Sequence, residues 1–143
     1  MKPVWIVDDD RSIRWVIEKA LSREGIAFSS FSSAQEALVA LSGDAPEVLV
    51  SDIRMPGRSG LELLQTVKQR HPAVPVTVMT AYSDLDSAVA AFQGGAYEYL
   101  PKPFDVDHAV GLIRRAVEES MRKETASEVQ EAAPEILGEA AAM

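Results

Sequence analysis

The chain has 143 residues, of which 47% are hydrophobic, and this size suits one globular domain with a short terminal extension. The absence of cysteine excludes disulfides, thiolate zinc sites and cysteine nucleophiles. A formal net charge of −8 argues against the basic face that direct binding to nucleic acid requires. The N-terminus meets an acid at Asp8, which does not fit a signal peptide, and no apolar run approaches the roughly 18 residues of a membrane span. We therefore expect a cytoplasmic chain with no membrane partner.

Short apolar runs rich in β-branched residues alternate with stretches of helical spacing along the chain. In chain order, the predicted strands are 4–7, 26–31, 48–50, 76–79 and 97–100. A predicted helix follows each strand. The first helix ends at Gly25, the second runs from the capping box Ser33–Glu36 to Gly43, and the third carries its apolar positions over 61–67 and ends before Pro72. The fourth runs from Ser83 to Gly94, and the fifth covers about 105–122. This alternation predicts an α/β fold of five strand–helix units, (βα)5, with a parallel sheet covered by helices on both faces.

Beyond Lys123 the composition changes to Glu, Ala and Ser with little periodicity. A segment of this kind has too few apolar residues at regular spacing to bury a face against the domain. It is predicted to be a linker.

Polar side chains collect at the carboxyl ends of the predicted strands, where open parallel α/β sheets bind their ligands. They are Asp8, Asp9 and Asp10 after the first strand, Asp52 after the third, Thr80 at the end of the fourth and Lys102 after the fifth. Carboxylates held close together need a cation or raised pKa values, and oxygen ligands suit Mg²⁺. A carboxylate can also attack phosphorus to form an aspartyl phosphate, and Asp52 is the best-placed acceptor.

Each of these residues also has a plainer interpretation. Asp8 to Asp10 could form a solvated turn and a helix N-cap, and Asp52 could cap a turn. Thr80 could be an ordinary strand residue, Lys102 a solvated cation, and Tyr99 a packing residue. The convergence of four strand ends with compatible chemistry favours a functional site over these separate interpretations.

Four motifs together resemble the receiver domains of two-component response regulators, over about residues 3–121. They are 7–10 (Val-Asp-Asp-Asp), 51–60 (Ser-Asp-Ile-Arg-Met-Pro-Gly-Arg-Ser-Gly), 79–81 (Met-Thr-Ala) and 100–104 (Leu-Pro-Lys-Pro-Phe). The resemblance implies a doubly wound, flavodoxin-like or CheY-like five-stranded sheet of order 2-1-3-4-5. It also implies a cis bond between Lys102 and Pro103, which proline tolerates.

The same resemblance implies a role for each residue of the site. Asp52 would be the phosphoacceptor and Lys102 would pair with the phosphate. Mg²⁺ would lie in the acidic pocket of Asp8 and Asp9, held with Asp52 and the backbone carbonyl of Arg54. Thr80 would bind the phosphoryl oxygens and act with the aromatic residue Tyr99 as the switch. The output and self-association face would lie on the fourth helix, fifth strand and fifth helix, and would include Asp84, Leu85, Val89 and Tyr99.

A narrower set of motifs resembles the NtrC family of nitrogen-regulation transcription activators. It comprises 12–16 (Ser-Ile-Arg-Trp-Val), 51–57, 68–72 (Lys-Gln-Arg-His-Pro) and 83–86 (Ser-Asp-Leu-Asp), while Tyr82 stands where this family is expected to have His. Residues 136–143 are similar to the opening of that family's AAA+ ATPase domain. The resemblance implies a receiver domain over 1–122, followed over 123–143 by a linker and the first residues of a truncated ATPase domain.

The partners implied are a sensor histidine kinase and a second copy of the chain, with DNA and sigma-54 RNA polymerase reached only through domains absent from it. Such a domain is not an enzyme, and assists only its own phosphorylation and dephosphorylation. A stand-alone receiver that acts by protein contact is an alternative. A phosphatase of the haloacid dehalogenase type is a second, but 8–12 (Asp-Asp-Asp-Arg-Ser) lacks the threonine of its Asp-x-Asp-x-Thr motif. A flavodoxin-like FMN carrier would need Ser, Thr and Gly in the acidic first loop.

Overall fold

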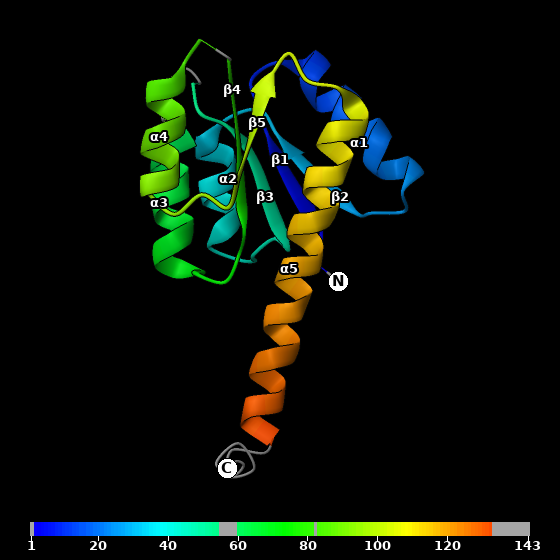
Figure 1. The fold of residues 1–143 in the computed structure, drawn as a ribbon, viewed down its shortest axis with the longest axis vertical. Coiled ribbons are helices and arrows are strands. Elements are labelled where there is room, and N and C mark those ends of the chain that lie inside the picture. Colours follow the sequence, from blue (N-terminus) through cyan, green and yellow to red (C-terminus); the bar gives the residue numbers. More distant parts are fainter. Residues whose placement is uncertain (1, 55–59, 82, 133–143) are drawn as a thin grey trace.

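The computed structural model describes residues 2–54, 60–81 and 83–132. Strands and helices alternate throughout: β1 Val4–Val7, α1 Arg11–Arg23, β2 Phe28–Phe31, α2 Ala34–Leu41, β3 Val48–Asp52, α3 Gly60–Arg70, β4 Val76–Ala81, α4 Leu85–Gln93, β5 Glu98–Lys102 and α5 Val106–Ala132 (Figure 1). All strand pairs are parallel, in the order β2-β1-β3-β4-β5. The predicted fold and strand order are confirmed.

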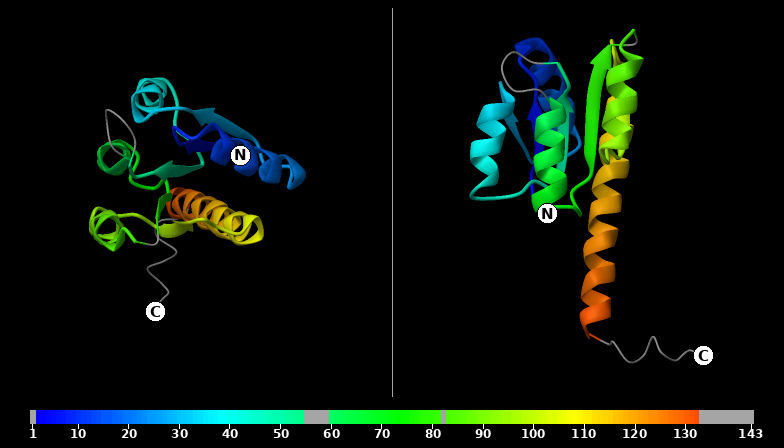
Figure 2. Two further views of the ribbon diagram at one scale, coloured as in Figure 1. Left: turned by 90° about the horizontal axis from the view of Figure 1, so that it is seen from above. Right: turned by 90° about the vertical axis from the view of Figure 1, so that its left-hand side faces the viewer.

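The sheet lies between two layers of helices, with α1 and α5 on one face and α2, α3 and α4 on the other (Figure 2). Successive residues of β1 enter opposite cores, since Val4 and Ile6 pack beneath α1 and α5 whereas Trp5 and Val7 pack beneath the other three helices. This double burial explains why β1 is entirely apolar and why β3 is apolar over its first three residues. Their carboxyl ends are therefore fixed by packing on both faces.

Three strands extend further toward their carboxyl ends than the sequence indicates. The pairing of Asp52 with Met79 and of Ala81 with Lys102 continues the ladder into the polar residues, so β3, β4 and β5 end at Asp52, Ala81 and Lys102. Apolar runs alone could not reveal this, because the ladder is made by backbone hydrogen bonds that polar residues also form. As a consequence, Asp52 and Lys102 are held by the sheet itself.

The fifth helix differs most from the prediction. It continues to Ala132 instead of stopping at Arg122, and in Figure 1 its second half projects beyond the sheet. The amphipathic pattern stops where the helix loses contact with the sheet, but Glu, Ala and Lys remain good helix formers there. No helix in the described ranges is both long enough and apolar enough to cross a membrane.

A buried polar contact ties α5 to the opposite edge of the sheet from the acidic residues. Ser120 donates its hydroxyl to Glu47 at 2.7 Å, and the other carboxylate oxygen of Glu47 accepts from the backbone N–H of Lys2 at 3.1 Å. Both Glu47 and Ser120 are buried. Glu47 thereby joins the start of β3, the N-terminal segment and α5.

Ser120→Ala is expected to lower the free energy of unfolding by about 1–3 kcal/mol, because it leaves a buried carboxylate oxygen without its donor. Chemical denaturation followed by circular dichroism measures the loss. Ser22→Ala, the same change at an exposed position of α1, is the matched control and should stay within about 0.5 kcal/mol. Equal effects at the two positions would show that the Glu47 contact contributes nothing specific.

Candidate functional site

Three carboxylates meet at the carboxyl ends of the neighbouring strands β1 and β3. Asp8 and Asp9 directly follow β1, Asp52 ends β3, and each offers an oxygen such that all three atoms lie within 4.8 Å of one another. Asp8 is fully buried, Asp52 nearly so, and Asp9 is exposed. The structure therefore brings together the acidic residues that the sequence placed at this edge, with one of them open to solvent.

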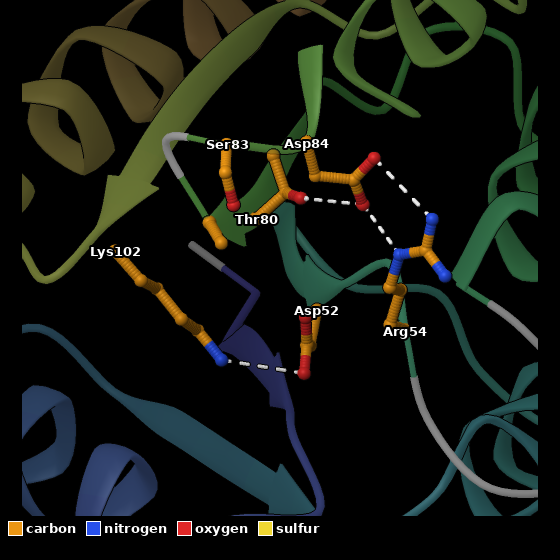
Figure 3. A pocket seen from close by; sticks show the side chains of 7 residues that line it. Asp52, Arg54, Thr80, Ser83, Asp84 and Lys102 are labelled. Atoms are coloured by element: carbon orange, nitrogen blue, oxygen red, sulfur yellow. Dashed lines mark hydrogen bonds and ion pairs between the residues drawn. The ribbon is translucent and has the colours of Figure 1, made fainter. Parts of the chain in front are cut away.

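Lys102 reaches this cluster from the end of β5. Its ammonium lies 2.8 Å from Oδ2 of Asp8 and 3.3 Å from Oδ2 of Asp52, so one cation bridges the two buried carboxylates (Figure 3 shows the contact with Asp52). The bond from Lys102 to Pro103 is cis, as the resemblance implied. Two further donors fix Asp8, because its side chain accepts from the N–H of Asp10 at 2.8 Å and its carbonyl accepts from Nη1 of Arg14 at 2.6 Å.

The acidic cluster carries more negative than positive charge. Burial raises the pKa of Asp8, and burial together with the repulsion of Asp8 raises the pKa of Asp52 against the opposing pull of Lys102. Burial alone would lower the pKa of Lys102, but its hydrogen bond with Asp8 and its attraction to both carboxylates outweigh this and raise that pKa. The lysine stays charged, yet one ammonium faces three carboxylates. Hard oxygen donors in this number and spacing fit a divalent cation such as Mg²⁺.

A second group of polar residues lines a pocket of about 420 Å³ next to the acidic cluster. The lining residues are Asp52, Arg54, Thr80, Ala81, Ser83, Asp84 and Lys102 (Figure 3). Thr80 is buried at the end of β4, and its hydroxyl lies 3.3 Å from Oδ2 of Asp84. In this structure the threonine hydroxyl is therefore hydrogen-bonded to Asp84, while Asp52 lines the same pocket.

Asp84 has two further partners. Its carboxylate caps α4 by accepting from the N–H of Ser87 at 3.3 Å, and it accepts from Nε and Nη2 of Arg54 at 2.5 and 3.3 Å (Figure 3). The Arg54 hydrogen bonds hold the pKa of Asp84 well below its usual range. The sequence interpretation assigned Asp84 to the output face and Arg54 only to a backbone carbonyl, so it missed this contact. An aspartate directly before a helical stretch was the available signal, since Asp is a favoured N-cap.

Glycine is required where α3 begins. A Cβ on Gly60 would lie 2.0 Å from the backbone oxygen of Asp52, and the N–H of Gly60 donates to the carbonyl of Ile53 at 2.8 Å. The start of α3 is thus pressed against the backbone of the acidic strand end. Motif residues 55–59 and Tyr82 lie outside the described residues.

The predicted switch and output residues lie near α4. Tyr99 on β5 is half-buried, and its hydroxyl is buried with no hydrogen-bond partner among the described residues. Leu85, Val89 and Phe92 are spaced along one face of α4 and are all exposed. Asp84 is turned away from this apolar stripe, toward Thr80 and Arg54.

Residues 4–114 match the family model of the response regulator receiver domain, and the chain belongs to this family. Among characterised proteins, it is 54% identical over 142 residues to the DNA-binding transcriptional regulator NtrC of Escherichia coli K12, a match that covers 98% of this chain and 30% of that protein. The chain thus corresponds to less than a third of the length of this relative.

Solved structures agree with this assignment. The solution structure of the apo NtrC receiver domain is 57% identical, with a TM-score of 0.74 over 82% of this chain and 94% of that one. The BeF3-activated form of the NtrC receiver domain gives a TM-score of 0.71 at the same identity, over 82% of this chain and 97% of that one. Because the chain belongs to the receiver family, the phosphatase and FMN-carrier alternatives are set aside.

Proposed function

We propose that the chain accepts a phosphoryl group on the carboxylate of Asp52 from the phosphohistidine of a sensor histidine kinase. The supporting observation is a buried carboxylate at the end of a central strand, bridged by a lysine and adjacent to two more carboxylates. During transfer the P–N bond of the donor breaks as the P–O bond to Asp52 forms. The donor ring, protonated on its other nitrogen, keeps the electron pair of the P–N bond and leaves as neutral imidazole. The chain would assist only its own phosphorylation and dephosphorylation.

The residues around Asp52 would position the group and neutralise its charge. Lys102 would move its ammonium onto a phosphoryl oxygen, and Thr80 would turn its hydroxyl from Asp84 to another. Asp8, Asp9, Asp52 and the carbonyl of Arg54 would hold Mg²⁺. When bound, this ion would neutralise the clustered carboxylates and the incoming phosphoryl oxygens.

The output would be a shift of α4. Movement of Thr80 would open space for Tyr99, whose hydroxyl is buried and has no hydrogen-bond partner in the described part of the chain. Taking a two-state equilibrium from 1:99 to 99:1 requires about 5.5 kcal/mol of differential stabilisation. Hydrogen bonds to a charged group contribute about 1.5–3 kcal/mol each, so about two to four new ones would suffice. The exposed residues Leu85 and Val89, with Tyr99 and the adjacent Asp84, would then form the output face and a homodimer contact on α4, β5 and α5.

The chain would be the receiver of an NtrC-type transcription activator, with nitrogen supply as the signal. This proposal is supported by 54% identity to NtrC across 98% of the chain. Residues 1–122 would be the receiver, and 123–143 would lead through the continued α5 into an AAA+ ATPase domain. DNA and sigma-54 RNA polymerase would be contacted only by such further domains, in the cytoplasm.

Thr80→Ala is expected to separate phosphorylation from the switch. With a small phosphodonor and Mg²⁺, the variant should still take up phosphoryl groups, but the NMR amide shifts of α4 seen in the parent should fall by more than half, because the hydroxyl that senses the phosphoryl group is gone. Thr66→Ala, which removes a hydroxyl bonded to a backbone carbonyl within α3, is the control and should behave like the parent. Parent-like α4 shifts in phosphorylated Thr80→Ala would remove threonine from the switch.

A further inference from the structure

The side chain of Arg54 has no role in the function proposed above, which uses only its carbonyl. Nevertheless it is held at the pocket by Asp84, and Oδ2 of Asp84 accepts from both Nε of Arg54 and the hydroxyl of Thr80 (Figure 3). Two donors on one oxygen are necessarily neighbours. The guanidinium and the Thr80 hydroxyl therefore lie on the same side of the pocket that Asp52 also lines.

We propose that the Arg54 side chain has two acceptors in turn, the Asp84 carboxylate before phosphorylation and the phosphoryl group on Asp52 afterwards. The inference rests on the proposed function, because it requires Asp52 to be the phosphoacceptor. Phosphorylation would then remove two donors from the N-cap of α4, Thr80 and Arg54, and leave Asp84 only its contact with Ser87. Arg54 would be both a phosphoryl-binding residue and part of the restraint on α4.

The exposure of the pair supports an exchange of partners. The Arg54 side chain is 75% exposed and that of Asp84 is 13% exposed, so the arginine can rotate without breaking packed contacts. The arginine end of this ion pair is open to water, which screens its attraction to the carboxylate. A phosphoryl group carries close to two negative charges and matches the fork of a guanidinium, so it competes well with a single carboxylate for the same arginine.

The backbone of Arg54 places its side chain within reach of the acceptor. It lies only two residues after Asp52, and its side chain lines the pocket that also contains Asp52, Thr80 and Lys102. The alternative is an ion pair that persists in both states and only anchors α4. The two accounts differ in one measurable respect, which is whether the effect of Arg54 on α4 disappears once Asp52 carries its ligand.

The amide of Ser87 is the probe, because its N–H donates directly to Oδ1 of Asp84. Hydrogen exchange at this amide reports how stably Asp84 caps α4. It is measured by NMR with and without Mg²⁺ and BeF3, which serves as the phosphoryl mimic. The parent is compared with Arg54→Gln, which keeps the backbone and a polar side chain. The control is Arg122→Gln, since Arg122 is 76% exposed and paired with Glu119 on α5. Occupancy by BeF3 is followed separately by fluorine NMR.

Without BeF3, Arg54→Gln is expected to speed exchange at Ser87 by about two- to fivefold, and Arg122→Gln to leave it unchanged. With BeF3 bound, the parent should exchange as fast as the variant, because its arginine has left Asp84. An equal increase with and without BeF3 would overturn the proposal, since Arg54 would then stay on Asp84 throughout. No increase in either state would overturn it as well, because the pair would not restrain α4.

Failure of the underlying function has a different signature. If the parent binds no BeF3, Asp52 is not the acceptor. If it binds BeF3 and Ser87 does not respond, the proposed α4 switch is wrong whatever Arg54 does. The Arg54 proposal stands only when Arg54→Gln speeds exchange at Ser87 in the absence of BeF3 and makes no difference once BeF3 is bound.

Discussion

Asp52→Asn is expected to abolish phosphoryl incorporation from a small phosphodonor in the presence of Mg²⁺. The carboxamide keeps the size and much of the hydrogen bonding of the side chain but lacks the anionic oxygen that attacks phosphorus. Incorporation is measured by intact-protein mass spectrometry. Asp44→Asn is the matched control, because Asp44 is exposed, lies outside the pocket and accepts a hydrogen bond from the N–H of Ala45 that an amide can also accept. Undiminished labelling of Asp52→Asn would remove this residue from its role.

The same substitution is expected to make the metal-free protein more stable at neutral pH. The pKa of Asp52 is raised by burial and by Asp8, so its ionised form is less favourable in the folded chain than in the unfolded one. A raised carboxyl pKa costs stability above the ordinary value of 3.8 and costs nothing well below it. The gain from Asp52→Asn in thermal unfolding should therefore appear as the pH rises above about 4 and vanish in acid. A gain of equal size at low pH would point to a cause other than charge.

Removal of divalent cations by a chelator is expected to slow phosphoryl incorporation into the parent at least about 100-fold, since a bound metal contributes several kcal/mol of charge stabilisation. Without the ion, the positive charge that pairs with Asp8 and Asp52 in the described residues is that of Lys102, which faces three carboxylates and an incoming anionic donor. The measurement is the rate of incorporation at fixed ionic strength with added chelator, followed by readdition of excess Mg²⁺, which should restore the rate. Sodium chloride in place of Mg²⁺ is the control for general screening. An unchanged rate in chelator would show that the acidic cluster does not work through a metal.

Much of the fold follows from local patterns. The alternation of β-branched runs with helical spacing predicts five strands and five helices. The rule that ligands bind at the carboxyl ends of strands places five polar residues at one edge of the sheet: Asp8, Asp9, Asp52, Thr80 and Lys102. These features are accessible because burial on both faces makes a central strand apolar and because parallel strands end at one edge. The extension of α5 to Ala132 could not be predicted in this way. Apolar residues recur at helical spacing only where a helix packs against the sheet, and the end of α5 does not pack there.

The contacts of side chains between distant loops could not be read from the sequence. Arg54 and Asp84 are thirty positions apart, and their ion pair depends on how the loop after β3 faces the start of α4. The N-cap role of Asp84 is local and was in principle visible, but its arginine partner was not. Resemblance to a family supplied functional roles for Thr80, Lys102 and Tyr99, and it did not indicate that Thr80 is hydrogen-bonded to Asp84 in this structure.

The central claim is that Asp52 forms an acyl phosphate. Borohydride reduces such a mixed anhydride at the acceptor aspartate to homoserine, so the chain can be phosphorylated, reduced, digested and analysed by tandem mass spectrometry. The account predicts homoserine at position 52 and unmodified aspartate at positions 8, 9 and 84. Homoserine at any of those three positions, with Asp52 intact, would contradict it.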